Sequence, residues 1–393
     1  MTQPIRIGIA GLGTATRQML PAFLADAAIE ISAAATRSAE KRNAFQQEYG
    51  VPVFEDAEQL CRYDGIDAVY IATPTELHTQ QIHLALDCGK HVLVEKPMAV
   101  TLEEARGIVE KAKQSGLTVI VGHSHSFDPP IKAIKDVLDS GRLGPIRMIH
   151  NWNYNDWLYR PRTKEELDTT LGGGVTFRQG SHQFDIIRYL GGGMVRSVRA
   201  MTGRWDETRP TEGSHVVYLE FENGLAATAV YNGYDHFHTS ELTWDIGEWG
   251  GHARRTDDSQ YGMSRKRLKG ISETEEMSLK QKRSQYQKPT SDHDPIRSPF
   301  FGLTIVSCEH GDIRQSPSGL LIYSDEEVEE VTLNRVPTAH DLVVREFVSA
   351  VSGRDESTTH DAAWGLANLE VCLAVLESSK RREEVLLKHQ VPW

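Results

Sequence analysis

The feature that most constrains this chain is a regular alternation of short apolar runs and amphipathic stretches in its first third. Apolar runs typical of buried strands occupy residues 5–10, 29–35, 67–72, 91–94 and 118–121. Helical patterns lie between them at residues 16–25, 38–49, 76–88 and 102–115. Strands that alternate with helices in this way predict βαβ units, and therefore an α/β fold with a doubly wound parallel sheet.

The pattern changes after Gly122. Helices are expected at 128–140, 183–189, 340–351 and 362–379, and alternating strands from 146 to 230, at 303–307 and at 320–323. Residues 216–221 precede an Asn223-Gly224 pair, which is a strong hairpin signal. We therefore predict two domains: residues 1–123 on the parallel sheet, and residues 124–393 as an α+β domain on a mostly antiparallel sheet. The second includes a charged insertion at 254–283, which is expected to be either a solvated helical segment or a mobile loop.

The charge and cysteine content limit the partners of the chain. A formal net charge of −12 disfavours binding to nucleic acid or to an anionic membrane, because phosphate groups need a basic face. No apolar run approaches the ~20 residues of a membrane helix, and no signal region precedes the first strand. The four cysteines form no CxxC pair, which fits a reducing compartment. We expect a cytoplasmic protein with a small-molecule partner, no nucleic acid and no membrane.

Two glycines lie between the first strand and the first helix, in Ala10-Gly11-Leu12-Gly13. Glycine lets the backbone approach a pyrophosphate, and a helix N-terminus favours its negative charge. The third glycine of the usual GxGxxG pattern is Thr16 here, so a plain tight turn is the alternative. Because the loop follows the first strand of a βαβ series, we favour a Rossmann dinucleotide-binding domain. The predicted contacts of the loop are Gly11, Leu12, Gly13, Thr14 and Ala15.

The end of the second strand bears on the choice between NAD and NADP. Rossmann domains that bind NAD usually place an acidic residue there, and this chain has Thr36-Arg37 instead. Arg37 could bind the 2′-phosphate of NADP, or it could stack on the adenine or point to solvent. The sequence is compatible with each of these roles for Arg37.

Two further motifs follow predicted strands, Ala72-Thr73-Pro74 and Glu95-Lys96-Pro97. Open α/β sheets bind their ligands at the carboxyl ends of parallel strands. Lys96, next to Glu95 and before a proline that could be cis, is well placed to act as a proton relay near a nicotinamide. Glu-Lys-Pro alone could also be a surface turn.

Together these motifs resemble the Gfo/Idh/MocA family, which includes glucose–fructose oxidoreductase and inositol dehydrogenase. The resemblance covers nearly the whole chain and runs through the motifs above and through His78, Phe127-Asp128-Pro129, the segment 141–146, Gly172-Gly173-Gly174, Gly180, His182, Asp185 and Glu377-Ser378.

The resemblance implies a Rossmann domain, a C-terminal domain with an open antiparallel sheet, and a homodimer or homotetramer formed through that sheet. It also implies Lys96 and His182 as the catalytic pair. Beyond the glycine loop, the expected cofactor residues are Thr36, Arg37, Ala72, Thr73, Pro74, His78, Glu95, Lys96, Pro97 and His123.

One position departs from the family pattern. Four residues after the glycine triplet, where the family usually has an aspartate, this chain has Arg178. A guanidinium matches a carboxylate, so Arg178 indicates an anionic substrate in place of a plain sugar. The alternative is an ion pair with a carboxylate of the protein itself.

The segment 151–162 is dense in aromatic residues and contains two arginines, which suits a flat, anionic ring. A sheet edge with a solvated tip is the alternative. The three histidines His123, His125 and His182 show no metal-ligand spacing, so no metal is expected. The predicted substrate residues are Trp157, Tyr159, Arg160, Arg162, Arg178, Gln179 and His125.

Within the family, the chain is similar to phthalate 4,5-cis-dihydrodiol dehydrogenases, in residues 157–162, 174–179, 211–213 and 306–309. This similarity implies oxidation of a carboxylated cyclic cis-dihydrodiol to a catechol, with NAD as the cofactor and NADP as the alternative. A sugar or inositol dehydrogenase and a non-catalytic, cofactor-sensing regulator are the competing hypotheses.

Overall fold

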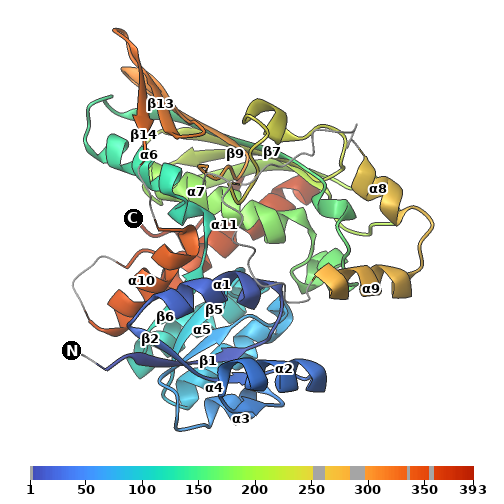
Figure 1. The fold of residues 1–393 in the computed structure, drawn as a ribbon. Coiled ribbons are helices and arrows are strands. Elements are labelled where there is room, and N and C mark those ends of the chain that lie inside the picture. Colours follow the sequence, from blue (N-terminus) through green and yellow to red (C-terminus); the bar gives the residue numbers. More distant parts are fainter. Residues whose placement is uncertain (1–2, 251–261, 284–296, 334–336, 354–357) are drawn as a thin grey trace. The chain divides into compact units, whose positions relative to one another are not determined.

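The computed structural model describes residues 3–250, 262–283, 297–333, 337–353 and 358–393 (Figure 1). The chain divides into two compact units. One contains the N-terminal segment up to Ser124 together with Pro337–Leu369, and the other contains His125–Val336 and Glu370–Trp393. In the described part of the chain, no helix is both long and apolar enough to span a membrane.

The first unit is built on a six-stranded parallel sheet in the order β3-β2-β1-β4-β5-β6. This order confirms the predicted doubly wound Rossmann sheet. Its central strands are buried on both sides, which is why they read as continuous apolar runs. The strands are β1 (Ile5–Ala10), β2 (Ile29–Ala35), β3 (Val53–Phe54), β4 (Ala68–Ile71), β5 (His91–Glu95) and β6 (Val119–Gly122).

Helices pack on both faces of this sheet. α1 lies beside α10, and α4 lies beside α3 and α5. Ser38 caps the N-terminus of α2, and Gly50 and Gly116 end α2 and α5 in the left-handed conformation, as their sequence signals predict. The helices are α1 (Thr14–Ala25), α2 (Ala39–Tyr49), α3 (Ala57–Cys61), α4 (His78–Asp87) after the short turn η1 (Thr75–Leu77), α5 (Leu102–Ser115) and α10 (Ala339–Val351).

Residues 337–369 pack with the first unit, whereas the sequence analysis places them in the second domain. α10 contacts α1, and the backbone amide of Val121 in β6 donates to the carbonyl of His360 at 2.8 Å. Helix α11 (Ala362–Arg381) begins in this unit and ends in the other. This segment belongs to the first unit because of long-range packing, which a local sequence pattern does not reveal.

The second unit is built on a nine-stranded sheet in the order β14-β13-β12-β11-β7-β10-β9-β8-β15. Every neighbouring pair is antiparallel except β7 and β10, which confirms the mostly antiparallel prediction. The strands are β7 (Ile146–Tyr154), β8 (Val195–Gly203), β9 (Ser214–Phe221), β10 (Ala226–Asn232), β11 (Leu303–Cys308), β12 (Gly311–Gln315), β13 (Gly319–Tyr323), β14 (Val328–Thr332) and β15 (Val385–Leu386).

Helices α6 (Pro129–Asp139) and α7 (Ser181–Gly191) pack against this sheet (Figure 1). α7 is buried along its whole length. The alternate residues of the central strands point the other way and stay exposed, among them Trp152, Val216 and Met201 at 41%, 57% and 47%. The strand register aligns these three in one row with Val230. The sheet therefore presents apolar side chains on an uncovered face.

The charged run predicted as a solvated insertion is partly ordered by ion pairs. Residues 254–261 of that run lie outside the described residues, and the rest forms α8 (Met263–Leu268) and α9 (Glu273–Arg283). Glu276 of α9 binds the Arg209 guanidinium at 2.8 Å, and Lys280 binds Glu166. These contacts attach α9 to its own unit, and the two helices agree with the helical alternative for this segment.

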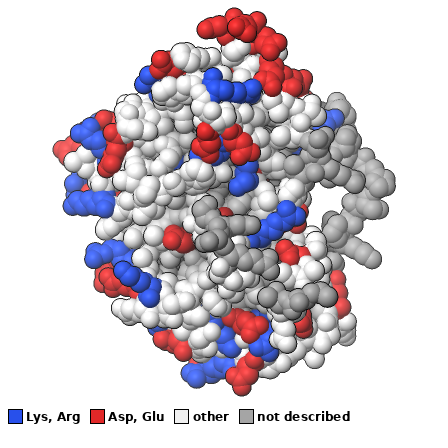
Figure 2. Space-filling view, turned by 90° about the vertical axis from the view of Figure 1, so that its left-hand side faces the viewer, with Lys and Arg blue, Asp and Glu red and all other residues white. Residues whose placement is uncertain are grey.

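The β13–β14 hairpin ends in a run of exposed acids, which Figure 2 shows as red side chains at the top of the view. Its tip carries Asp325, Glu326 and Glu327. This run contributes to the net charge of −12 and is a solvated tip.

Candidate active site

The glycine loop of the first unit is shaped by close backbone packing. Gly11 has φ +95°, and a Cβ there would lie 2.7 Å from the carbonyl oxygen of Ala72. Only glycine accommodates both conditions. Thr16, at the position of the third glycine, donates its hydroxyl to the Gly11 carbonyl at 2.5 Å. The threonine thus fixes the loop from the first turn of α1.

The N-terminus of α1 fits a pyrophosphate. Gly13 is the N-cap, no side chain caps the helix, and its first turn has no acidic residue. A Cβ built on Gly13 would meet nothing within 4 Å. First-turn amides without a side-chain cap, beside open space, suit an anion. Leu12 precedes the N-cap, and Thr14 and Ala15 are the first two residues of the helix.

At the end of β2, two basic side chains bind backbone carbonyls. Lys41 Nζ donates to the Leu12 carbonyl at 2.9 Å, and an Arg42 guanidinium nitrogen donates to the Thr36 carbonyl at 2.8 Å. Arg37 is exposed. Lys41 therefore links α2 to the glycine loop, and Thr36 is fixed through its backbone.

His78 connects the two loops that follow β4 and β5. Its Nδ1 lies 2.9 Å from the Pro97 carbonyl, its Nε2 lies 2.9 Å from the Thr73 carbonyl, and the side chain is 1% exposed. Carbonyls only accept, so both nitrogens donate together only in the protonated ring. His78 therefore holds Ala72-Thr73-Pro74 beside Glu95-Lys96-Pro97.

Lys96 follows the last residue of β5 and is half-buried. The peptide between Lys96 and Pro97 is cis. The preceding Glu95 accepts a 2.7 Å hydrogen bond from the hydroxyl of the buried Tyr70 on β4. Burial, and then Glu95, raise the pKa of Tyr70, which keeps the phenol a donor. Glu95 is thereby fixed directly before Lys96.

His123 follows β6, is 2% exposed, and has its ring centroid 6.1 Å from that of His360. His360 in turn contacts Glu346 through Nδ1 at 3.2 Å. The first unit thus brings together the loops after β1, β2, β4, β5 and β6 at the carboxyl edge of its sheet, where the predicted cofactor residues lie.

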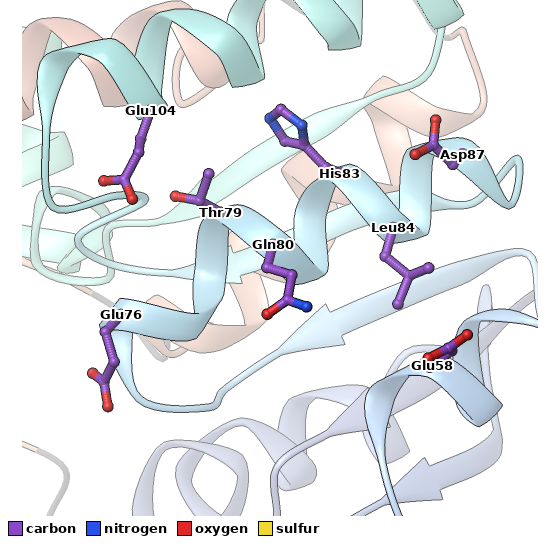
Figure 3. Close-up of a pocket in the computed structure, with 8 residues that line it drawn as sticks. All are labelled: Glu58, Glu76, Thr79, Gln80, His83, Leu84, Asp87 and Glu104. Atoms are coloured by element: carbon purple, nitrogen blue, oxygen red, sulfur yellow. The ribbon is translucent and has the colours of Figure 1, made fainter.

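A surface pocket on the helical side of this unit has a different character (Figure 3). Its lining contains four carboxylates and none of the predicted cofactor residues, so it suits neither a pyrophosphate nor an anionic substrate. α4 supplies Thr79, Gln80, His83, Leu84 and Asp87, while Glu58, Glu76 and Glu104 come from α3, η1 and α5.

In the second unit, the glycine triplet 172–174 packs against backbone and a buried carboxylate. A Cβ on Gly173 would lie 2.6 Å from the Glu165 carbonyl, and one on Gly174 would lie 2.2 Å from Glu212 Oε1. Glu212 accepts from the Thr169 hydroxyl at 2.7 Å and from the Thr176 amide at 3.2 Å. The triplet therefore fixes the entry to the segment that carries the predicted substrate residues.

That segment is a π-helical turn, η6 (Thr176–Gly180), which runs directly into α7. π-helical turns are rare and often occur at functional sites. Arg178 and Gln179 lie on η6, and His182 lies in the first turn of α7 with 6% exposure. Gln179 Oε1 accepts a 3.4 Å hydrogen bond from Tyr231.

A buried hydrogen-bond network supports the start of α7. His215 Nε2 donates to Gln183 Oε1 at 2.9 Å, and Gln183 Nε2 donates to Asn151 Oδ1 at 2.6 Å. Asn151 Nδ2 donates to the Phe301 carbonyl at 3.1 Å. Burial lowers the pKa of His215 to about 3, so the ring is neutral. The network fixes the residue next to His182.

His125 and His182 lie together in a cluster of rings. Their ring centroids are 4.6 Å apart in an edge-on arrangement, and Phe301 lies 4.3 Å from the first and 5.0 Å from the second. His125 Nδ1 contacts Asp128 Oδ2 at 2.9 Å, and both side chains are buried. Trp249 packs against His125 in a tilted arrangement, with a centroid distance of 4.8 Å.

The arginines of the segment 157–162 bind groups of the protein. Arg160 donates to Asp156 at 2.7 Å and lies 3.6 Å from Glu248. Burial opposes its charge, but the two carboxylates outweigh this and raise the pKa of Arg160. Arg162 stacks on Trp157 at 4.0 Å and donates to the Trp157 carbonyl at 3.0 Å.

Tyr159 donates its hydroxyl to Asp206 at 2.7 Å, and both Tyr159 and Trp157 are buried. These contacts indicate that the aromatic segment supports its own unit.

Arg178 and two other cationic side chains stabilise the charged form of Glu166. Burial opposes ionisation of Glu166, yet Arg162, Lys280 and Arg178 lower its pKa to about 2. Arg178 is half-buried. A positively charged group of side chains therefore lies beside η6.

The sequence analysis missed Asp128, Trp249 and Phe301 as neighbours of the predicted histidines. Asp128 carried a local signal, three residues after His125 in a family motif. Trp249 and Phe301 are more than 100 residues from His125 in sequence, so that only the fold brings them together.

Comparison with known proteins identifies the family. The family model for the oxidoreductase family with an NAD-binding Rossmann fold matches residues 5–123, and the GFO/IDH/MocA C-terminal domain model matches residues 131–247. A 1-carboxy-3-chloro-3,4-dihydroxycyclohexa-1,5-diene dehydrogenase from Comamonas testosteroni is 37% identical over 96% of this chain and 95% of its own. The chain belongs to the Gfo/Idh/MocA oxidoreductase family. It is a dehydrogenase that uses a nicotinamide cofactor.

This Gfo/Idh/MocA member is also similar to a polyol dehydrogenase and to a solved structure. The scyllo-inositol 2-dehydrogenase (NAD(+)) of Bacillus subtilis (strain 168) is 32% identical over 44% of this chain and 50% of its own. Among solved structures, a Bordetella bronchiseptica RB50 protein named as a dehydrogenase has a TM-score of 0.90 and 38% identity, over 98% of this chain and all of its own.

The WlbA dehydrogenase of Bordetella pertussis, solved with NADH and UDP-GlcNAcA, has a TM-score of 0.70 at 19% identity, over 98% of this chain and 99% of its own. At that identity the match shows the shared fold.

Proposed function

We propose that this dehydrogenase oxidises a carboxylated cyclic cis-dihydrodiol of the phthalate 4,5-cis-dihydrodiol type to the corresponding catechol, in aromatic catabolism. The observation that carries the proposal is the near full-length similarity to the Comamonas dehydrogenase, whose named substrate is a carboxylated dihydroxycyclohexadiene. Arg178, in place of the family's usual aspartate, supports an anionic substrate.

Lys96 and His182 are the proposed acid–base residues. Lys96, helped by His182, takes the proton of the substrate hydroxyl as the C–O bond becomes a carbonyl. The bound nicotinamide supplies the acceptor for the hydride that leaves the same carbon. The resulting hydroxy-ketone loses its ring proton by tautomerisation and becomes the catechol, and aromatisation makes the oxidation favourable.

Arg178 is the proposed anchor of the substrate carboxylate, because it lies on η6 four residues before His182. Arg160 and Arg162, predicted as further anchors, contribute less directly in this proposal, since Asp156, Glu248 and Trp157 bind them.

NAD is the proposed cofactor. Lys41 and Arg42, the basic neighbours of Arg37, bind backbone carbonyls. In this proposal the exposed Arg37 lies over the adenine or beside an unphosphorylated ribose. NADP remains the alternative, which the same assay tests.

A homo-oligomer formed through the sheet of the second unit is proposed as well. Its uncovered face carries Trp152, Val216, Met201 and Tyr218, all more than 40% exposed. Contiguous apolar side chains on an open sheet favour burial against another copy.

The test is a substrate panel followed by absorbance of the reduced nicotinamide. Purified protein is mixed with phthalate cis-4,5-dihydrodiol, an inositol or a hexose, each with NAD⁺ and with NADP⁺. We expect reduction with the dihydrodiol and faster reduction with NAD⁺. Reduction only with inositol or hexose would replace the proposal by a polyol dehydrogenase of the same family. Tight cofactor binding without turnover of any substrate would favour a cofactor-sensing regulator.

A further inference from the structure

The ring cluster around His182 includes one large aromatic side chain with an exposed surface. Trp249 is 51% exposed, whereas its neighbours His125, His182 and Phe301 are exposed by 6% or less. Its indole packs against His125 in a tilted arrangement, and His125 and His182 meet edge-on. The exposed indole therefore belongs to the same ring cluster as His182, with His125 as the ring that contacts both.

The loop that carries Trp249 is fixed by the residue before it. Glu248 accepts a 3.0 Å hydrogen bond from Asn155 Nδ2, and it lies 3.6 Å from the half-buried guanidinium of Arg160. The Gly247 carbonyl accepts from the Phe300 amide at 3.1 Å. Arg160 and the Phe300 amide thus both support the same short segment.

We propose that Trp249, backed by His125, stacks on the planar ring of the substrate, and that the Arg160–Glu248 pair positions it. That the substrate contains a planar, conjugated ring rests on the proposed function. A conjugated, nearly flat cyclohexadiene offers a π-face to the indole, and an aromatic pair adds ~0.5–1.5 kcal/mol beyond its buried area. Arg160 is accordingly a positioning residue.

Steady-state kinetics test the stacking. Trp249→Ala should raise KM for the carboxylated dihydrodiol roughly 5- to 20-fold and leave kcat within about 2-fold, because stacking favours substrate and transition state alike. Trp249→Phe should restore most of the affinity. Trp205→Ala is the matched control, since it removes a 65% exposed indole that stacks on Tyr234. An unchanged KM in Trp249→Ala would overturn the proposal.

Fluorescence separates this proposal from the reaction. Phthalate, a flat aromatic dicarboxylate that cannot be oxidised, serves as the probe. It should quench a component of tryptophan emission in the wild type that is absent in Trp249→Phe, and the quenching should weaken in Glu248→Gln. Quenching without turnover of the dihydrodiol would support the stacking role and contradict the proposed reaction. Turnover of the dihydrodiol with equal quenching in the wild type and Trp249→Phe would contradict the stacking role alone.

Discussion

At the scale of single residues, the polar groups of the candidate site differ in how they are held. His78 bridges two carbonyls on neighbouring loops, and Arg160 lies between two carboxylates. Other groups of the protein hold both side chains in place, and both therefore help to maintain the arrangement of the candidate site. Arg178 lies on a π-helical turn beside Glu166, where its charge adds to that of Arg162 and Lys280.

Replacement of Arg178 tests the anionic substrate. Arg178→Ala should raise KM for the carboxylated dihydrodiol about 10- to 100-fold, since charged hydrogen bonds contribute about 1.5–3 kcal/mol. Arg178→Lys should recover part of this, because it keeps the charge but loses the forked geometry. Arg142→Ala, which removes an exposed arginine paired with Glu329, is the control. If Arg178→Ala leaves KM and kcat unchanged, Arg178 does not bind the substrate.

Much of the first unit's site could be predicted at this scale, because strand-end motifs lie next to one another in any parallel sheet. Gly11 and Lys96 are examples. The role of His78 in holding two loops together could not be predicted. Its partners are the backbone carbonyls of Thr73 and Pro97, and every residue has such a carbonyl.

At the scale of elements, α7 depends on buried polar contacts. His215 on β9 holds Gln183 on α7, which holds Asn151 on β7. A buried donor or acceptor that loses its partner costs about 1–3 kcal/mol. The position of His182 therefore depends on strands that follow and precede it in sequence.

His215→Phe should lower the free energy of unfolding at pH 7 by about 1–3 kcal/mol, because Gln183 loses a buried partner. The folded-state pKa of His215, about 3, lies below the ordinary value of 6.5, so the folded protein binds fewer protons. This contribution is complete above pH 6.5 and is lost as the pH falls towards 3.

The stability gap between wild type and His215→Phe should therefore narrow from pH 7 to pH 4, as measured by urea unfolding. His310→Phe, at an exposed position, is the control. A gap that stays constant or widens over this range would show that His215 is not a buried neutral ring.

At the scale of the whole molecule, the strands of the first unit could be predicted from the sequence, but the assignment of every segment to its unit could not. The parallel sheet of the first unit was predictable strand by strand, because each strand and helix is local and periodic. Residues 337–369 were not, because α10 and the start of α11 join that unit through contacts more than 200 residues away in sequence. For the same reason, the contacts of Trp249 and Phe301 with His125 could not be predicted from the sequence.

The uncovered sheet face predicts self-association. Val216→Asp places a charge in the middle of the row that includes Trp152 and Met201, so it should shift the oligomer to smaller species in light scattering. Val328→Asp, at a similarly exposed position on the terminal strand pair, should not. A wild type that is already monomeric at micromolar concentration would contradict the proposed assembly.

An isotope label follows the transfer of the hydride itself from the dihydrodiol to the cofactor. Phthalate cis-4,5-dihydrodiol that carries deuterium on both carbinol carbons is incubated with the enzyme and NAD⁺, and the reduced cofactor is analysed by mass spectrometry. The account predicts a reduced cofactor one mass unit heavier than normal, a catechol product, and a rate at least 100-fold lower in Lys96→Ala, in line with the ~10²–10⁴-fold worth of a positioned base. No reduced cofactor, reduced cofactor without the label, or near-normal turnover in Lys96→Ala would contradict it.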